Sequence, residues 1–105
     1  MQIPASTHVR LWRYEVPSEQ RPAFCRHYAS DGTWARLFAE HEGYVGTLLW
    51  QDEEDAGVFY TADHWTSASA FDAFRQMAKA RYEALDAEYE ALTTAESFIG
   101  AGSTP

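Results

Sequence analysis

The side chains in this sequence that could take part in a reaction are a histidine, an arginine and a tryptophan, set among many aromatic residues. His27 lies between Phe24 and Tyr28 on the inward stripe of a segment with helical spacing. A histidine in this position either transfers a proton or donates a hydrogen bond inside a pocket, or is half-buried and bonded to a backbone carbonyl. The residue types alone leave both interpretations open.

Arg81 is the second candidate, and it is followed directly by Tyr82 on a long segment with helical periodicity. Near the mouth of a cavity, its guanidinium would hold an anionic or phenolate oxygen. On the surface it would be solvated or would pair with an acid such as Asp86.

Aromatic residues make up 15% of the 105 residues, which is dense for a small domain. They either fill a core and a dimer interface or line a cavity that grips a flat aromatic ligand by stacking. The aromatic residues concerned include Trp12, Trp34, Tyr44, Trp50, Tyr60, Trp65 and Tyr82.

The absence of several sequence motifs argues against the corresponding kinds of site. The sequence has no Gly-x-Ser-x-Gly, no phosphate loop, no dinucleotide glycine fingerprint and no Cys-x-x-Cys pair. The histidines at positions 8, 27, 41 and 64 do not share a helical face at ligand spacing, so we expect no metal site. The acidic run over 52–55 reads as a solvated loop, because calcium loops space their ligands around a glycine.

Charge and composition narrow the partners. The net charge is −8 and the isoelectric point is near 4.8, without a basic stripe, which disfavours nucleic acid and anionic membranes. We expect no secretory signal and no membrane span, because no positive segment precedes an apolar run and no apolar stretch approaches about 20 residues. Cys25 is the single cysteine and fits a reducing compartment, so the expected location is cytoplasmic.

The elements that would position these side chains follow a clear order. The pattern predicts a strand over 8–16, a helix over 19–29 capped by Ser18, a short helix over 33–41 and strands over 44–51 and 57–65. A long helix over 67–92 and a strand over 95–100 follow. This is the order of a ferredoxin-like βαββαβ fold of the α+β class. One domain over 8–100 is expected, with a disordered segment over 1–7 and a tail over 101–105.

The strand over 57–65 is the most informative element. Val58, Tyr60, Ala62 and His64 alternate with Phe59, Thr61, Asp63 and Trp65, so both faces carry large side chains and are expected to be covered. Trp65 lies where this strand turns into the long helix. We therefore expect Trp65 to border a ligand cavity between sheet and helix.

Four segments of the chain resemble the antibiotic biosynthesis monooxygenase family. They are Asp63-His64-Trp65 with the following Ser-Ala-Ser-Ala-Phe-Asp-Ala-Phe, Trp34-Ala-Arg-Leu-Phe38, Gly43-Tyr-Val-Gly-Thr-Leu-Leu and Glu96-Ser-Phe-Ile-Gly100. The resemblance runs from about Val9 to Gly100. It implies that two ferredoxin-like protomers pair through their sheets into a homodimeric α+β barrel, each with its own cavity.

The resemblance also implies a chemistry. The cofactor-independent oxygenases of this family use a tryptophan where Trp65 stands, with asparagine and arginine partners. They deprotonate a phenolic substrate, and the carbanion reacts with O2 without flavin or metal. Trp65 matches and Arg81 could replace the arginine, but this chain contains no asparagine.

The haem-degrading branch of the family is similar at Trp65 but departs elsewhere. It needs an asparagine on the first strand and an iron-ligating histidine on the helix after the tryptophan. Arg75-Gln-Met-Ala-Lys79 occupies that stretch, and no histidine follows His64. Haem degradation is therefore disfavoured.

Two functions of different classes remain. The first is a monooxygenase without cofactor that oxidises a small phenolic or polyketide-like aromatic with O2. The second is a non-catalytic dimer that binds a small apolar ligand or supports a partner enzyme. For the enzyme we predict catalytic roles for Trp65, His27 and Arg81, and ligand contacts from Trp34, Tyr82, Phe24 and Tyr44.

Overall fold

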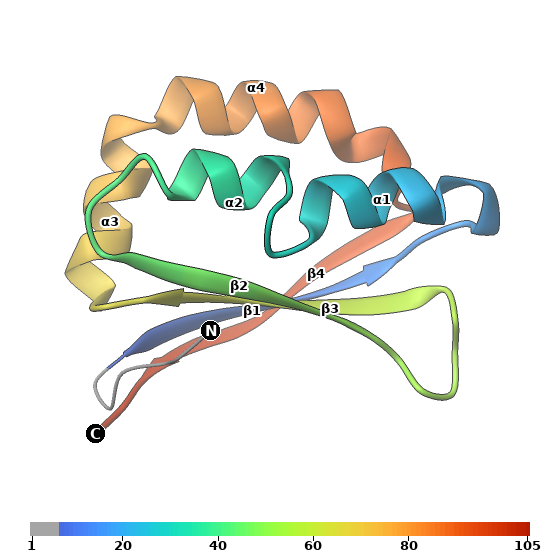
Figure 1. Cartoon of the computed structure of the whole chain (residues 1–105), viewed down its shortest axis with the longest axis horizontal. Helices are drawn as coiled ribbons and strands as arrows, with labels where there is room; N and C mark the ends of the chain where they lie inside the picture. The colour runs from blue at the N-terminus through green and yellow to red at the C-terminus, as the bar shows by residue number, and fades with distance from the viewer. Residues whose placement is uncertain (1–6) are drawn as a thin grey trace.

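Four antiparallel strands form one sheet in the order β2-β3-β1-β4, and the helices lie on one face of it (Figure 1). The computed structural model describes residues 7–105. Its elements are β1 His8–Glu15, η1 Ser18–Gln20, α1 Arg21–Tyr28, α2 Thr33–Phe38, β2 Tyr44–Gln51, β3 Val58–Trp65, α3 Ala68–Met77, α4 Lys79–Tyr89, η2 Glu90–Leu92 and β4 Ala95–Ser103. The predicted ferredoxin-like α+β fold is confirmed.

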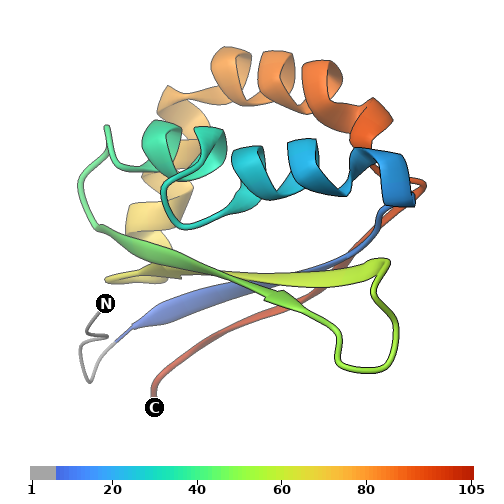
Figure 2. The ribbon, with the colours of Figure 1, turned by 45° about the vertical axis from the view of Figure 1, so that its right-hand side comes forward.

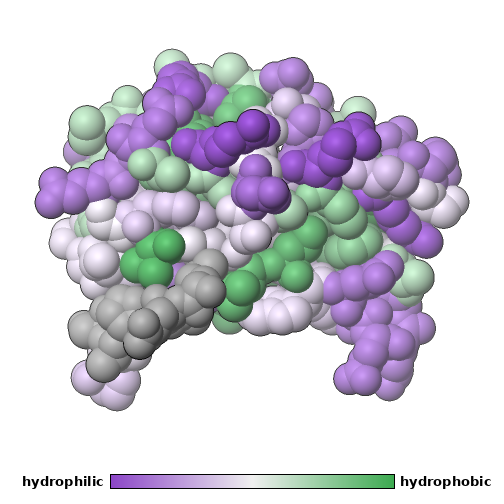
Figure 3. Space-filling view, in the orientation of Figure 1, coloured by the Kyte–Doolittle hydropathy of each residue, from purple (hydrophilic) through white to green (hydrophobic). Residues whose placement is uncertain are grey.

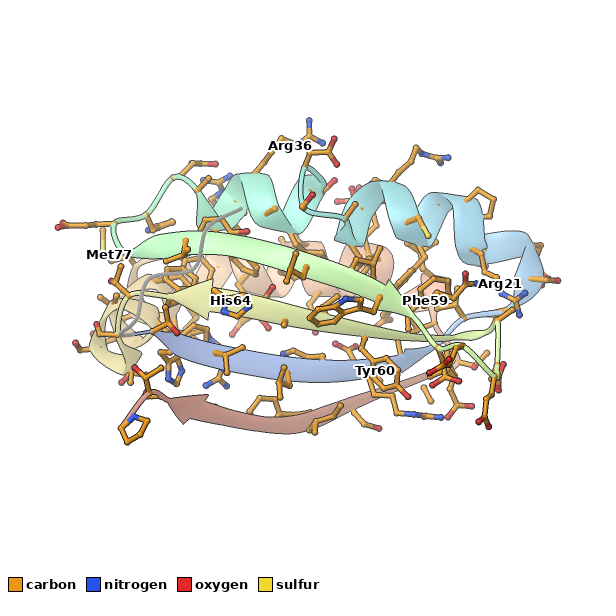
Figure 4. The ribbon with its side chains drawn as sticks, turned by 60° about the horizontal axis from the view of Figure 1, so that its bottom comes forward. Arg21, Arg36, Phe59, Tyr60, His64 and Met77 are labelled. Atoms are coloured by element: carbon orange, nitrogen blue, oxygen red, sulfur yellow. The ribbon has the colours of Figure 1, made fainter. Side chains whose placement is uncertain are left out.

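The sheet has one covered and one open face. A rotated view shows all the helices on one side of the strands and no helix on the other side (Figure 2). Residues 59, 61, 63 and 65 of β3 face the helices, and Tyr60 and His64 lie on the open face (Figure 4). In the space-filling view, polar side chains cover the helices and apolar ones gather below them along the edge of the sheet (Figure 3). The open face is therefore the large surface that no other part of residues 7–105 covers.

Aromatic rings fill the layer between sheet and helices. Trp65 and Phe24 are fully buried, and Phe74 and Leu37 are nearly so. Phe24 stacks on Tyr28 with ring centroids 4.2 Å apart, and Phe74 meets Trp65 at 5.2 Å. Offset and edge-on contacts of this kind add to the free energy gained by removing the rings from water.

The predicted long helix over 67–92 is wrong: the chain breaks at Ala78 into α3 and α4. Ala78 has φ −103° and ψ 13°, outside the helical region. A straight helix of that length would measure about 39 Å, more than the 36 Å longest extent of the molecule. The break lets α3 pack at the end of the sheet and α4 cross above α1 and α2 (Figure 1).

Two smaller boundaries also differ from the prediction. Ser18 begins a 3-10 turn, and no side chain caps α1, so the predicted N-cap is wrong. β4 extends to Ser103, three residues beyond its predicted end. The Thr104 N–H donates to the Thr7 carbonyl at 2.9 Å, and the Thr7 N–H donates to Thr104 Oγ1 at 3.0 Å. Of the segment predicted to be disordered, residues 1–6 lie outside the described residues and Thr7 is buried.

Gly43 joins α2 to β2 and gives a test of this packing. Its φ is +92°, and a Cβ there would lie 2.5 Å from the Ala70 Cβ and 2.9 Å from Thr66 Oγ1. We expect Gly43→Ala to lower the free energy of unfolding by about 2 kcal/mol or more, through backbone strain and the clash with α3. Gly100→Ala is the control, because a Cβ there meets nothing within 4 Å. Equal urea midpoints for the two variants would contradict this packing.

Candidate functional site

A cleft opens between the covered face of the sheet and the helix layer. Its cavity volume is about 30 Å³, room for about two water molecules, and the empty space is about 390 Å³ when the open mouth is included. Aromatic rings form most of the walls, with polar groups on the sheet and at the mouth. The residues that line it are Trp12, Tyr14, Tyr28, Trp34, Phe38, Thr47, Thr61, Asp63, Tyr82, Asp86 and Glu96.

Asp63 on β3 is the ionisable group at the floor of the cleft. It is partly buried, and its Oδ1 accepts a hydrogen bond from Thr47 Oγ1 at 2.8 Å. Burial raises the pKa of Asp63 to about 6, and the Thr47 hydrogen bond and the charge of Arg10 only partly oppose this. A carboxylate with a pKa near neutrality can take up and release a proton under physiological conditions, as a general base requires.

A chain of hydroxyl groups leads away from Asp63. The Tyr44 hydroxyl lies 2.7 Å from Thr47 Oγ1. Because Thr47 gives its proton to Asp63, Tyr44 is the donor in that second bond. Tyr44 itself does not line the cleft, so it acts on the site through Thr47.

Arg10 is the cation whose charge acts on Asp63. The two residues face each other across the β1–β3 pair. The Arg10 guanidinium lies over the Phe71 ring at 3.9 Å and faces the Phe98 ring at 4.8 Å, so aromatic faces hold it in place. Burial lowers the pKa of Arg10, which nevertheless remains charged.

The tyrosine and tryptophan side chains of the cleft carry uncharged polar groups. Burial raises the pKa of Tyr14 and of Tyr28, so both phenols stay protonated, and the Tyr14 hydroxyl lies 3.4 Å from Thr61 Oγ1. The Trp34 indole Nε1 is buried near the Tyr28 hydroxyl but forms no hydrogen bond of good geometry among the described residues. Such an orphaned donor normally finds an acceptor in a protein group, water or ligand.

Of the predicted ligand-contacting residues, Trp34 and Tyr82 line the cleft and Phe24 does not. The Phe24 side chain is fully buried between Tyr14, Tyr28 and Phe59, where it belongs to the core. Its position on the inward stripe of α1 is as predicted.

Trp65 lies behind the cleft. It is fully buried against Phe38, Tyr44, Phe71 and Phe74, so the expectation that it borders the cavity is wrong for this cleft. Its indole Nε1 has no partner among the described residues. The cavity stops at Phe38, whose ring meets Trp65 at 5.8 Å and closes the space in front of it.

His27 and Arg81 lie on other parts of the surface. His27 Nδ1 is 2.7 Å from Thr33 Oγ1, and its ring packs on Tyr89 at 4.1 Å. Arg81 forms a two-pronged ion pair with Glu40, at 2.7 and 3.0 Å, across an open groove between α2 and α4. The structure therefore does not bring Trp65, His27 and Arg81 together.

The sequence reasoning missed Asp63, Thr47, Asp86 and Glu96. A signal for Asp63 was present, because strand alternation places it on the face of Phe59 and Trp65, where an unpaired acid is unusual. Glu96 and Asp86 belong to different elements, and only the folded structure shows that both line the cleft.

The described part of the chain shows neither a metal site nor a membrane-spanning helix. Residues 7–105 contain no group of three or more His, Cys, Asp or Glu side chains placed to hold a metal ion. Within the same range, no helix has both the length and the apolar character needed to cross a membrane.

Comparison with known proteins identifies the family of this chain. The model of the family described as antibiotic biosynthesis monooxygenase matches residues 7–84, which is most of the chain. The chain belongs to this family. No curated protein sequence matches it.

Solved structures share the antibiotic biosynthesis monooxygenase fold at low sequence identity. SnoaB, a cofactor-independent oxygenase from Streptomyces nogalater, is 20% identical, with a TM-score of 0.64 over 93% of this chain and 90% of SnoaB. MupZ from Pseudomonas fluorescens is 12% identical, with a TM-score of 0.65 over 92% of this chain and 69% of MupZ. PA3566 from Pseudomonas aeruginosa is 14% identical, with a TM-score of 0.60 over 98% and 95%. At these identities the likenesses show the fold.

The hydrogen bond from Thr47 to Asp63 can be tested by titration. Thr47→Val keeps the shape and deletes the donor that favours the carboxylate, a charge-assisted bond worth about 1.5–3 kcal/mol. We expect the pKa of Asp63 to rise above about 6. Carboxyl-carbon NMR over a pH series measures this shift.

Thr61→Val is the matched control, because Thr61 lines the cleft but bonds to Tyr14. An Asp63 titration that is the same in Thr47→Val as in the wild type would show that this bond does not set the pKa.

Proposed function

We propose that this chain is a cofactor-independent monooxygenase that oxidises a small phenolic or polyketide-like aromatic with O2 in the cleft. The observation that carries the proposal is Asp63, a carboxylate with a pKa of about 6 at the floor of an aromatic-walled cleft. Membership of the antibiotic biosynthesis monooxygenase family supports it.

Asp63 serves as the general base in the proposed reaction. It takes the phenolic proton, and the electrons delocalise onto a ring carbon that bears hydrogen. That carbon donates an electron to O2, and the two radicals combine to a peroxide. The O–O bond then breaks: one oxygen remains as a ring carbonyl, and the other leaves as water with the hydrogen of that carbon and the proton that Asp63 returns. A phenol with a free ring C–H and O2 thus give a quinone and H2O, and no external reductant is needed.

The buried tyrosines have a supporting role in this proposal. Tyr14 and Tyr28 keep their protons, because burial raises the pKa of both, and so they can donate hydrogen bonds to a substrate oxygen. The Trp34 N–H is a further donor, which forms no hydrogen bond of good geometry among the described residues. Donors aimed at a developing negative charge stabilise it in a site from which water is excluded.

Trp65 is proposed to act from behind the cleft by holding Phe38 and Tyr44 in place. His27 and Arg81 remain candidates from the sequence, but both lie outside the cleft, and the geometry gives them no contact with a substrate there. Asp63 therefore replaces them as the catalytic residue of the proposal.

The non-catalytic alternative is favoured by one observation, the cavity volume of about 30 Å³. A tricyclic ligand needs a wider space, so the helix layer must move to admit it. α4 is suited to such a movement because none of its residues is fully buried, whereas α3 is anchored by Phe74. If α4 does not open, the domain is a dimer that supports another protein.

Oxygen uptake with 1,8-dihydroxyanthrone, a tricyclic phenol with an activated CH2 group, tests the proposed reaction. We expect one O2 consumed for each quinone formed. Asp63→Asn should lower kcat at least about 100-fold, the typical contribution of a general base. In the wild type, kcat/KM should fall as the pH drops below about 6, where Asp63 becomes protonated.

Stability measurements separate this effect from misfolding. Burial raises the pKa of Asp63 in the folded chain, so its ionised form opposes folding, and stability is lost as the pH rises from about 4 through about 6. Asp63→Asn should therefore raise the free energy of unfolding at pH 8 by about 1–2 kcal/mol, less than the full shift implies because the side chain is partly exposed. Asp55→Asn, in the exposed loop, is the control. Full activity in Asp63→Asn would exclude Asp63 as the base, and anthrone binding without oxygen uptake would favour the alternative.

A homodimer that buries the open face of the sheet is proposed as the assembled form. This face carries the apolar side chains of Val9, Leu11, Leu48 and Trp50, all at least partly exposed. Trp50 is 48% exposed, and a patch of this kind is typical of a protein interface.

Sedimentation at micromolar concentration should give twice the 11.9 kDa chain mass. Trp50→Glu should shift the protein to monomer, and Met77→Glu should not, because Met77 is exposed on the helix side. A wild-type mass near that of one chain would refute the dimer.

A further inference from the structure

The cleft is lined by acids and by no basic residue. Asp63 lies at the floor, and Asp86 of α4 and Glu96 of β4 line the same space. Both Asp86 and Glu96 are solvent-exposed residues, which places them at the mouth. Within residues 7–105 neither forms a salt bridge; the ion pairs there join Arg13 to Glu15 and Arg81 to Glu40.

Asp86 lies close enough to Glu96 for its charge to disfavour the ionised form of the Glu96 carboxyl. Although Glu96 is exposed as a residue, partial burial of its carboxyl raises its pKa, and the charge of Asp86 raises it further. No basic side chain contributes to this balance. A positive charge placed between them would relieve the repulsion.

The walls beside the mouth suit a cation as well. Trp12, Tyr28 and Tyr82 present aromatic rings to the cleft, and ring faces attract organic cations. The Arg75 guanidinium already lies 4.3 Å from the centre of the Tyr82 ring, without a salt bridge to Asp86 or Glu96. Acids and ring faces together are the usual surroundings of a bound ammonium group.

A second and independent observation points to the other end of the ligand. Trp34 lines the cleft with 8% of its surface exposed, and its buried indole Nε1 has only the Tyr28 hydroxyl near it and forms no hydrogen bond of good geometry among the described residues. This donor needs an acceptor atom, which a phenolic oxygen supplies. The cleft thus offers carboxylates to a positive group and a free N–H to an oxygen.

We propose that the substrate is an amino-substituted phenol, with its protonated amine between Asp86 and Glu96 and its phenolic oxygen toward Trp34 and Asp63. This inference rests on the proposed function for the role of Asp63, but the recognition of the amine does not. A protonated amine gives the substrate a positive charge, whereas the proposed reaction requires only a phenol.

Three phenols that differ in charge test the inference by binding alone. Tyramine is cationic, 4-ethylphenol is neutral and 3-(4-hydroxyphenyl)propionate is anionic, on the same ring. With binding followed by tryptophan fluorescence at pH 7.5 and low salt, tyramine should bind at least about tenfold more tightly than 4-ethylphenol. The anionic phenol should bind most weakly, and added salt should weaken tyramine binding alone.

Variants of the mouth locate the effect. Glu96→Gln and Asp86→Asn should each weaken tyramine binding roughly fivefold and leave 4-ethylphenol unchanged. Glu83→Gln, which removes an exposed acid of α4 outside the cleft, is the control. Equal affinity for tyramine and 4-ethylphenol, or equal losses in all three variants, would overturn the inference. Because no turnover is measured, a failed oxygenase assay with intact charge selectivity would reject only the proposed reaction.

Discussion

The loss of water around the Asp63 carboxylate is the constraint on which the cleft depends. An ionised carboxyl loses much of its hydration between a sheet and aromatic rings, and a single hydrogen bond from Thr47 with the charge of Arg10 restores only part of it. A fold selected for stability alone would place an apolar side chain there. The position keeps an acid whose ionisation is costly, and cost of this kind concentrates where a protein does chemistry.

Aromatic residues serve two purposes in the same layer. Trp65, Phe24 and Phe74 exclude water from the core, while Trp12, Trp34 and Tyr82 line the cleft beside them. The boundary between the two groups is Phe38, which contacts Trp65 on one side and the cleft on the other. Because the Phe38 ring packs on Trp65 and Trp34 at once, a change of packing in the core would shift the wall of the site.

The fold could be predicted from the sequence because alternation, helical spacing and turn residues act locally. Strand β2 has the predicted bounds, and Phe59 and Trp65 lie on the predicted face. The break at Ala78 was not predicted because the apolar spacing continues through it, and no local pattern records how long a helix the fold accommodates. The family resemblance was confirmed for the same reason, since it rests on element order.

The site was harder to predict, because it depends on which faces meet. Trp34 and Tyr82 were predicted to contact a ligand and do line the cleft. Residue type alone suggested Trp65, His27 and Arg81, whereas the raised pKa of Asp63 comes from its surroundings in the folded chain. The pairing of Asp86 on α4 with Glu96 on β4 arises only after the chain has turned back between these two elements. The charge of a cleft therefore depends on which elements come together in the folded structure to line it.

The break at Ala78 also separates a helix whose side chains are needed for folding from one whose side chains are freer to change. α3 carries Phe74 into the core and must keep its shape, whereas α4 has no fully buried residue and still forms one wall of the cleft. Substitutions on the inner side of α4 can therefore alter what the cleft accepts at little expense to folding. A family built on this plan can diversify its ligands through one short helix while the sheet and its aromatic layer stay the same.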